Sequence, residues 1–99
     1  MSKVYLVTYY YPGDVDDLLP LAEVLTEYNW WHYINGSWLV EVTDGSDANT
    51  LFEKLRPHLP DTATLLVIEV GTDRQGWLPP KAWDWIKQTI PKRELTLSA

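Results

Sequence analysis

The sequence predicts one α+β domain whose elements follow the order β-α-β-β-α-β. Two kinds of apolar pattern alternate along its 99 residues: β-branched and aromatic runs, which are typical of strands, and stripes with a helical period. An Asn-Gly dipeptide at residues 35–36 separates two of the strand-like runs, which indicates a hairpin. With 45% hydrophobic residues, the chain has enough apolar side chains for one core. We therefore expect the ferredoxin-like arrangement, a four-stranded antiparallel sheet with two helices on one face.

The first strand and the first helix lie before residue 29. Residues 4–10 are β-branched, aromatic or leucine and end at a Pro-Gly pair, which predicts a strand that is apolar on both faces. Residues 14–28 change to a helical period. Because Pro20 fits only the first turn of a helix, we expect the N-cap at Asp16 or Asp17. The apolar stripe of this helix contains Leu18, Leu21, Ala22, Leu25 and Tyr28.

The Asn35-Gly36 dipeptide predicts a type I′ turn, because both residues accept a positive φ. This turn fixes the register of the hairpin, so that Trp31 opposes Val40, and opposed residues share a face of the sheet. The face expected to meet the helices contains Trp31, Tyr33, Trp38, Val40 and Val42. The other face contains Trp30, His32, Ile34, Leu39 and Glu41.

A second helix and a fourth strand follow the hairpin. We expect Ser46 or Asp47 to cap the helix, whose apolar stripe consists of Ala48, Leu51, Phe52, Leu55 and Leu59. Residues 64–70 are almost continuously hydrophobic, which suits a central strand that is covered on both faces.

The C-terminal part is expected to form a short helix and a tail, at residues 79–99. Two prolines at 79–80 precede the helical pattern, and residues 94–97 either add an edge strand or fray. We expect a single domain over residues 1–99, with its core at about residues 3–71.

Two helices cover only one sheet face, although the strands place large apolar groups on both. Because a large exposed apolar patch usually marks an interface, we predict a two-fold symmetric homodimer that buries the open face. The alternative is a monomer in which the helix that contains Trp83 and Trp85 folds back over its own sheet. The residues predicted for the dimer interface are Tyr5, Val7, Tyr9, Trp30, His32, Ile34 and Leu39.

Composition excludes several classes of function. The chain has no cysteine, which excludes disulfides, thiolate metal sites and a cysteine nucleophile. Its formal charge of −6 is uneven, because Lys3 is the one basic residue before Lys54, and this disfavours a nucleic-acid partner. No glycine-rich phosphate loop or other cofactor motif is present, so we expect no cofactor. Without a membrane-spanning run or a leader pattern, we expect a cytoplasmic protein.

Several segments resemble the small bacterial SinR-like family over about residues 4–88. They are Tyr5-Leu6-Val7 before Pro12-Gly13, Trp30-Trp31-His32, Ser37-Trp38-Leu39-Val40, Leu65-Leu66-Val67-Ile68-Glu69-Val70-Gly71 and Asp84-Trp85-Ile86. That family looks like a branch of the superfamily that contains the CRISPR-associated Cas-two proteins and the VapD ribonuclease toxins. The resemblance implies a ferredoxin-like fold and a symmetric dimer, but no assigned activity.

The nuclease-type members of that superfamily have a Tyr-Asp pair at the end of the first strand, where this chain has Tyr9 and Tyr10. A phenol is a poor ligand for Mg²⁺ or Mn²⁺, the ions that a ribonuclease of this type needs. Asp14 is a weak candidate metal ligand, and helix capping is the favoured explanation of its position. The candidates for catalysis are Tyr10, Asp14 and His32, although an interface role is favoured for His32.

Three functions are compatible with these patterns, and the sequence favours the first. It is a homodimeric interaction module without catalysis that contacts another protein. The second is a divergent ribonuclease resembling VapD, and the third is a dimer that binds nucleic acid without cleaving it. Exposed aromatic side chains stack on bases in single-strand binders, but those proteins surround them with Lys and Arg, whereas Glu41 is the charge near these aromatics.

Overall fold

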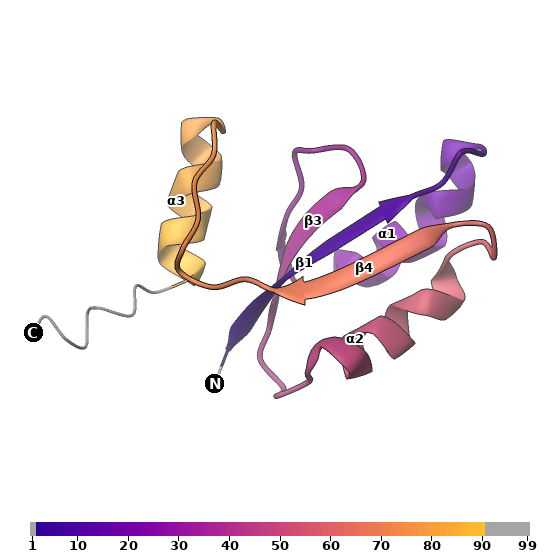
Figure 1. The fold of residues 1–99 in the computed structure, drawn as a ribbon, viewed down its shortest axis with the longest axis horizontal. Helices are drawn as coiled ribbons and strands as arrows, with labels where there is room; N and C mark the ends of the chain where they lie inside the picture. Colours follow the sequence, from indigo (N-terminus) through magenta and orange to yellow (C-terminus); the bar gives the residue numbers. More distant parts are fainter. Residues whose placement is uncertain (1, 91–99) are drawn as a thin grey trace, which may run out of the picture.

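The computed structural model describes residues 2–90 and contains a four-stranded antiparallel sheet with three α-helices, an α+β fold as predicted. The order of strands across the sheet is β2-β3-β1-β4 (Figure 1). The elements are β1 (Lys3–Tyr10), the 3-10 helix η1 (Val15–Leu18), α1 (Leu19–Leu25), β2 (Asn29–Trp31), β3 (Ser37–Val42), α2 (Ala48–Leu55), the 3-10 helix η2 (Arg56–His58), β4 (Thr64–Glu69) and α3 (Pro80–Thr89). The predicted strand at residues 94–97 lies outside the described residues.

The main core lies between one face of the sheet and the helices α1 and α2. Alternate residues of β1 and β3 point into it, and the two helices contribute their leucine stripes. Its buried members are Tyr5, Val7, Leu21, Leu25, Trp38, Val40, Val42, Leu51, Leu55 and Leu59. The predicted stripe of the first helix, the leucines and Ala48 of the second stripe, and the inward position of Trp38, Val40 and Val42 are therefore confirmed. Phe52 is not part of this core, and the prediction that Tyr33 faces the helices is wrong, because Tyr33 lies in the loop after β2 and is 63% exposed.

The prediction that Tyr5 and Val7 belong to the open face is wrong. Both side chains are buried in the main core, where they are 1% and 0% exposed, and the Tyr5 hydroxyl donates a hydrogen bond to the Ser46 carbonyl oxygen at 3.0 Å. Tyr9 faces the same way and packs against this core. Because both faces of β1 are apolar, the sequence alone gives no basis for deciding which face meets the helices.

The predicted register of the hairpin is wrong by one residue. Trp31 opposes Leu39 and Trp30 opposes Val40, so the two tryptophans exchange faces. The physical reason is the turn: Gly36 has a φ of 79°, whereas none of the described non-glycine residues has a positive φ, which excludes a type I′ turn. Trp30 consequently lies beside Trp38 on the helix side of the sheet, with the two ring centroids 5.1 Å apart.

A second, smaller core lies on the opposite face of the sheet, where α3 packs over the beginning of β1. Val4, Ile86 and Ile90 are its buried members, and Leu39 packs against them. The Trp85 indole Nε1–H also donates a hydrogen bond to Asn29 Oδ1 at 3.2 Å. The C-terminal helix therefore folds back over its own sheet, as in the monomeric alternative, but at one end of the open face.

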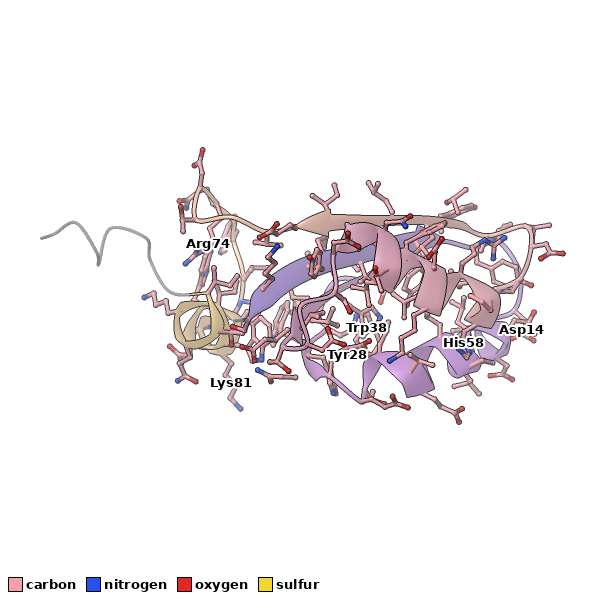
Figure 2. The ribbon with its side chains drawn as sticks, turned by 90° about the horizontal axis from the view of Figure 1, so that it is seen from below. Asp14, Tyr28, Trp38, His58, Arg74 and Lys81 are labelled. Atoms are coloured by element: carbon pink, nitrogen blue, oxygen red, sulfur yellow. The ribbon has the colours of Figure 1, made fainter. Side chains whose placement is uncertain are left out.

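β4 is an edge strand, and the prediction of a central strand covered on both faces is wrong. It pairs with β1 on one side, and Leu65 and Val67 pack against the main core. On its other face Leu66 and Ile68 are 52% and 47% exposed. In Figure 2, α1 and α2 lie on one side of β4, and no described helix covers the other side.

An aspartate caps the N-terminus of the helical segment that follows β1 and of the helix that follows β3. Asp14 caps η1, because its Oδ1 accepts a hydrogen bond from the Asp16 backbone N–H at 3.0 Å, so the predicted N-cap at Asp16 or Asp17 is wrong. A 3-10 turn inserted before α1 moves the cap toward the N-terminus. Asp47 caps α2 as predicted, and its Oδ1 accepts a hydrogen bond from the Thr50 N–H at 2.8 Å.

We expect Asp47→Ala to lower the thermal unfolding midpoint by several degrees at neutral pH, while Asp47→Asn, which retains a good N-cap, changes it little. Hydrogen bonds from Thr50 hold the pKa of the Asp47 carboxyl below its usual range. This stabilisation is therefore complete above the ordinary aspartate pKa and is lost as the pH falls through the lower pKa of the folded state. Thermal melts from neutral pH to acid should show the unfolding midpoints of the wild type and Asp47→Ala converging. A difference between these midpoints that stays constant with pH would contradict the capping role.

Candidate functional site

A cavity of about 300 Å³ lies where β1 ends, and it brings together two of the three residues predicted for catalysis, Tyr10 and His32. We call it the tyrosine–histidine cavity. Its lining residues are Tyr9, Tyr10, Tyr11, Val15, Leu18, His32, Asn35 and Gly36. They come from the end of β1, from η1 and from the β2–β3 loop, so the cavity depends on the pairing of β1 with β3.

His32 is held in one orientation by two contacts. Its Nδ1 lies 2.9 Å from the carbonyl oxygen of Ser37. Because a carbonyl oxygen only accepts hydrogen bonds, Nδ1 holds a proton, so Nε2 is the nitrogen with the lone pair whenever the imidazole is neutral. The ring also stacks on Trp38, with centroids 4.2 Å apart and planes inclined by 7°. These contacts within one chain give the half-buried His32 a positioned hydrogen-bond acceptor.

Tyr9 is fixed by the same tryptophan. The indole Nε1–H of Trp38 donates a hydrogen bond to the Tyr9 hydroxyl at 3.0 Å, so this hydroxyl still has its own proton to donate. The Tyr9 backbone N–H donates to the Gly36 carbonyl oxygen at 2.8 Å. A Cβ at Gly36 would lie 2.7 Å from the Tyr9 carbonyl oxygen, so both space and the positive φ require glycine there.

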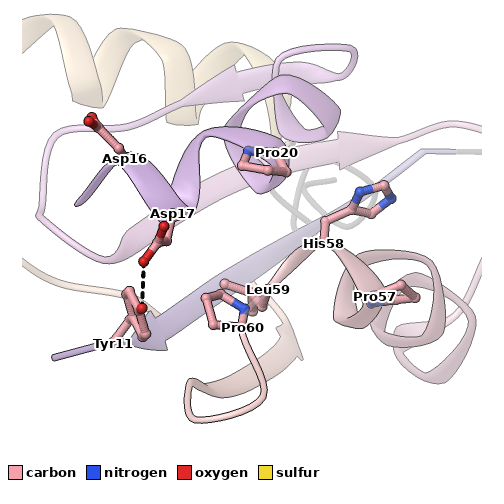
Figure 3. A pocket seen from close by; sticks show the side chains of 8 residues that line it. All are labelled: Tyr11, Asp16, Asp17, Pro20, Pro57, His58, Leu59 and Pro60. Atoms are coloured by element: carbon pink, nitrogen blue, oxygen red, sulfur yellow. Dashed lines mark hydrogen bonds between the residues drawn. The ribbon is translucent and has the colours of Figure 1, made fainter. Parts of the chain in front are cut away.

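Tyr10 and Tyr11 complete the aromatic lining. Tyr10 is 67% exposed at the end of β1. The Tyr11 hydroxyl donates a hydrogen bond of 2.6 Å to Asp17 Oδ2, and this bond to a carboxylate raises the pKa of the Tyr11 phenol. Figure 3 shows this pair among the residues that line a second cavity, of about 490 Å³, which shares Tyr11 with the first. That second cavity is lined by Tyr11, Asp16, Asp17, Pro20, Pro57, His58, Leu59 and Pro60.

Asp14, the third predicted candidate and the predicted metal ligand, is not among the residues that line either cavity. Its carboxylate caps η1 instead. Within residues 2–90, no group of three His, Asp or Glu side chains is arranged to hold a metal ion.

Two basic residues of the second half, Arg74 and Lys81, lie away from the tyrosine–histidine cavity. In Figure 2, Arg74 and Lys81 are at the opposite end of the molecule from Asp14 and His58. Arg56 donates hydrogen bonds to three backbone carbonyl oxygens, those of Leu59, Pro60 and Asp61. Lys54 lies over the Tyr28 ring, with its Nζ 5.0 Å from the centroid. These contacts favour structural roles for Arg56 and Lys54.

The structure adds three residues to the site that the sequence interpretation had placed elsewhere or omitted. Tyr9 and Tyr11 line the cavity beside Tyr10, and Trp38 contacts both Tyr9, through a hydrogen bond, and His32, through ring stacking. The run of three tyrosines was the available signal, because it lies at the end of a predicted strand, directly before the Pro12-Gly13 pair. The role of Trp38 had no sequence signal, since its partners come from β1 and from the loop.

No family model matches this chain, and neither a curated protein nor a solved structure matches it. The resemblance to the SinR-like family therefore stays a prediction. No helix within residues 2–90 has the length and apolar character needed to cross a bilayer.

Proposed function

We propose that this protein is a noncatalytic homodimeric interaction module of the cytoplasm, with a ferredoxin-like fold similar to that of the SinR-like and Cas-two-like proteins. The sheet order β2-β3-β1-β4, with two helices on one face, supports the ferredoxin-like arrangement. The dimer follows from the open face of the sheet. A protein partner would bind the assembled dimer.

The uncovered apolar strip on β4 is the observation that supports the dimer. Leu66 and Ile68 are 52% and 47% exposed on an edge strand, and Ile68 opposes Leu6 of β1 on the same face. α3 covers this face at Val4, and the uncovered strip lies farther along the same face, beyond the area that α3 covers. We call Leu6, Leu66 and Ile68 the open strip. Contiguous apolar surface of this kind is typical of interfaces.

A second copy of the chain is the partner that best matches the open strip. A two-fold interface places the same patch on both sides, so an uncharged apolar strip meets an uncharged apolar strip and no isolated charge is buried. On the same face of the sheet, the charged residue Glu41 opposes Val4 rather than the open strip, and its carboxylate accepts a hydrogen bond from Asn29 Nδ2 at 2.9 Å. A nucleic acid is a poorer match, because the strip contains no Lys or Arg.

We expect wild-type protein at high micromolar concentration to scatter light as a species of twice the 11.5 kDa protomer mass. Leu66→Glu should dissociate it, because two carboxylates would be buried against apolar side chains across the dyad. The matched control is Leu19→Glu, since Leu19 has a similar exposure of 57% but lies at the start of α1. It should leave the dimer intact.

A wild-type species of 11.5 kDa at that concentration would contradict the dimer. Equal dissociation by both variants would show that added charge, rather than the open strip, determines assembly. Circular dichroism of each variant checks that Leu66→Glu remains folded, as its half-exposed position predicts.

The ribonuclease and nucleic-acid-binding alternatives have weaker support from the geometry. Asp14 caps η1, and Arg56 binds backbone carbonyl oxygens. Incubation with labelled RNA and DNA in Mg²⁺ or Mn²⁺ tests both alternatives. Cleavage that Asp14→Ala abolishes would replace the proposed function by a nuclease, and salt-sensitive retention without cleavage would favour a nucleic-acid binder.

A further inference from the structure

The tyrosine–histidine cavity combines hydrogen-bond acceptors with exposed aromatic rings. When the His32 ring is neutral its acceptor is Nε2, because the Ser37 carbonyl oxygen accepts the hydrogen bond from Nδ1–H. Asn35 adds an amide oxygen and Tyr10 a phenol oxygen to the same lining. A ligand that donates several hydrogen bonds from one rigid group would satisfy these acceptors together.

The aromatic rings favour a cation over a neutral donor. Three consecutive tyrosines line the cavity, and their ring faces attract positive charge through the ring quadrupole. Tyr10 is 67% exposed, so its ring is accessible to a ligand. The lining contains neither Lys nor Arg, which would repel such a ligand.

The charge of the surrounding chain also favours a cationic ligand. The formal charge of residues 1–53 is −8, because Lys3 is their one basic residue and nine are acidic. Lys3 is at the far end of β1 and lies 4.0 Å from Glu69, so it does not neutralise the cavity. Asp17 lies beside the cavity, where Tyr11 donates to its carboxylate. An anion at this place would meet this negative charge and would find neither Lys nor Arg in the lining.

We propose that the tyrosine–histidine cavity binds a guanidinium group, presented either by a small molecule or by an arginine side chain of a partner protein. A guanidinium is planar, stacks on aromatic rings and has five N–H donors in fixed directions, whereas an ammonium is a more strongly hydrated point charge. The assignment uses contacts within one protomer and does not depend on the proposed dimer.

The first experiment compares three capped amino acids by titration into isotopically labelled protein. N-acetyl-arginine amide should shift the backbone amide signals of Tyr9, Tyr10 and Gly36 in NMR spectra. N-acetyl-citrulline amide, which has the same shape but no charge, should bind much more weakly, and so should N-acetyl-lysine amide. Equal binding of citrulline or lysine, shifts that map elsewhere, or no binding at millimolar concentration would overturn the proposal.

Two exposed tyrosines provide matched variants. Tyr10→Leu removes a lining ring and should lower the affinity for N-acetyl-arginine amide by about two- to fivefold, as expected for one exposed cation–π contact. Tyr33→Leu removes a ring that is 63% exposed outside the cavity and should leave the affinity unchanged. Equal affinities for the two variants would overturn the proposed site, and neither change should unfold the protein because both side chains are exposed.

A final titration distinguishes the two sources of the guanidinium. A capped Gly-Gly-Arg-Gly-Gly peptide that binds more tightly than free arginine would support a partner protein, whereas tighter binding of free arginine would support a small molecule. The Leu66→Glu variant should bind the probe as the wild type does. If the wild type binds the probe and the Leu66→Glu variant does not, the assignment of the site to a single protomer is overturned.

Discussion

Replacing Trp38 with alanine is expected to lower the free energy of unfolding by about 3–5 kcal/mol. The side chain is 5% exposed in the main core, so its removal leaves a cavity that the sheet and helices cannot fill. Its loss also removes the donor to the Tyr9 hydroxyl and the ring on which His32 stacks. Urea unfolding followed by circular dichroism measures the change.

Trp77→Ala is the matched control, because Trp77 is 100% exposed in the loop between β4 and α3. Substitutions at such surface positions usually change stability by no more than about 0.5 kcal/mol. If Trp38→Ala were as mild as Trp77→Ala, Trp38 would have to lie outside the core. The register of β3 against β1 would then be incorrect.

The second large effect is expected for Leu55→Ala, which should reduce the free energy of unfolding by about 2–5 kcal/mol. Leu55 is 0% exposed at the end of α2, and it belongs to the leucine stripe that packs against the sheet. Alanine favours helix, so a loss of stability would report the missing packing rather than a weaker helix.

Leu19→Ala serves as the comparison for Leu55→Ala, because it makes the same chemical change at a side chain that is 57% exposed at the start of α1. Its urea midpoint should stay close to that of the wild type. Similar slopes in urea would show that all three proteins expose comparable surface on unfolding. Equal midpoints for the two variants would mean that α2 does not pack on the sheet through Leu55.

Local patterns were sufficient to predict which segments form strands and helices. The leucines of α2 recur with a helical period, and Asp47 lies where a capping residue belongs, so both were identified from neighbours in the chain. The strand at 64–69 was identified in the same way. Its position at the sheet edge was not, because a continuous apolar run occurs both in covered strands and in an edge strand with an exposed apolar face.

The sidedness of β1 and the hairpin register depend on contacts that are distant in sequence. Tyr5 meets Ser46 and Val40, and neither contact leaves a pattern within residues 3–10. For the hairpin, a common dipeptide preference was outweighed by the pairing of the Tyr9 N–H with the Gly36 carbonyl oxygen. A one-residue shift was then enough to exchange Trp30 and Trp31 between the faces.

The candidate site was predictable in its composition but not in its assembly. Tyr10 and His32 were identified from the sequence, yet they are separated by a helix in the chain, and the return of β3 to β1 brings them together. Asp14 was grouped with them because carboxylates are common metal ligands, whereas its backbone geometry makes it a cap.

The central position of β1 also determines when the protein can fold. Its two neighbours in the sheet, β3 and β4, begin at Ser37 and Thr64. The strand that is synthesised first therefore has both of its pairing partners only after β4 has been synthesised. Until residue 69 has left the ribosome, Tyr5 has no partner on the β4 side. Closing such long loops before any pairing is gained slows folding. During synthesis, the aromatic first strand therefore has no sheet partner until β3 is complete at residue 42, and its other side stays unpaired until residue 69, which makes it a natural target for a chaperone.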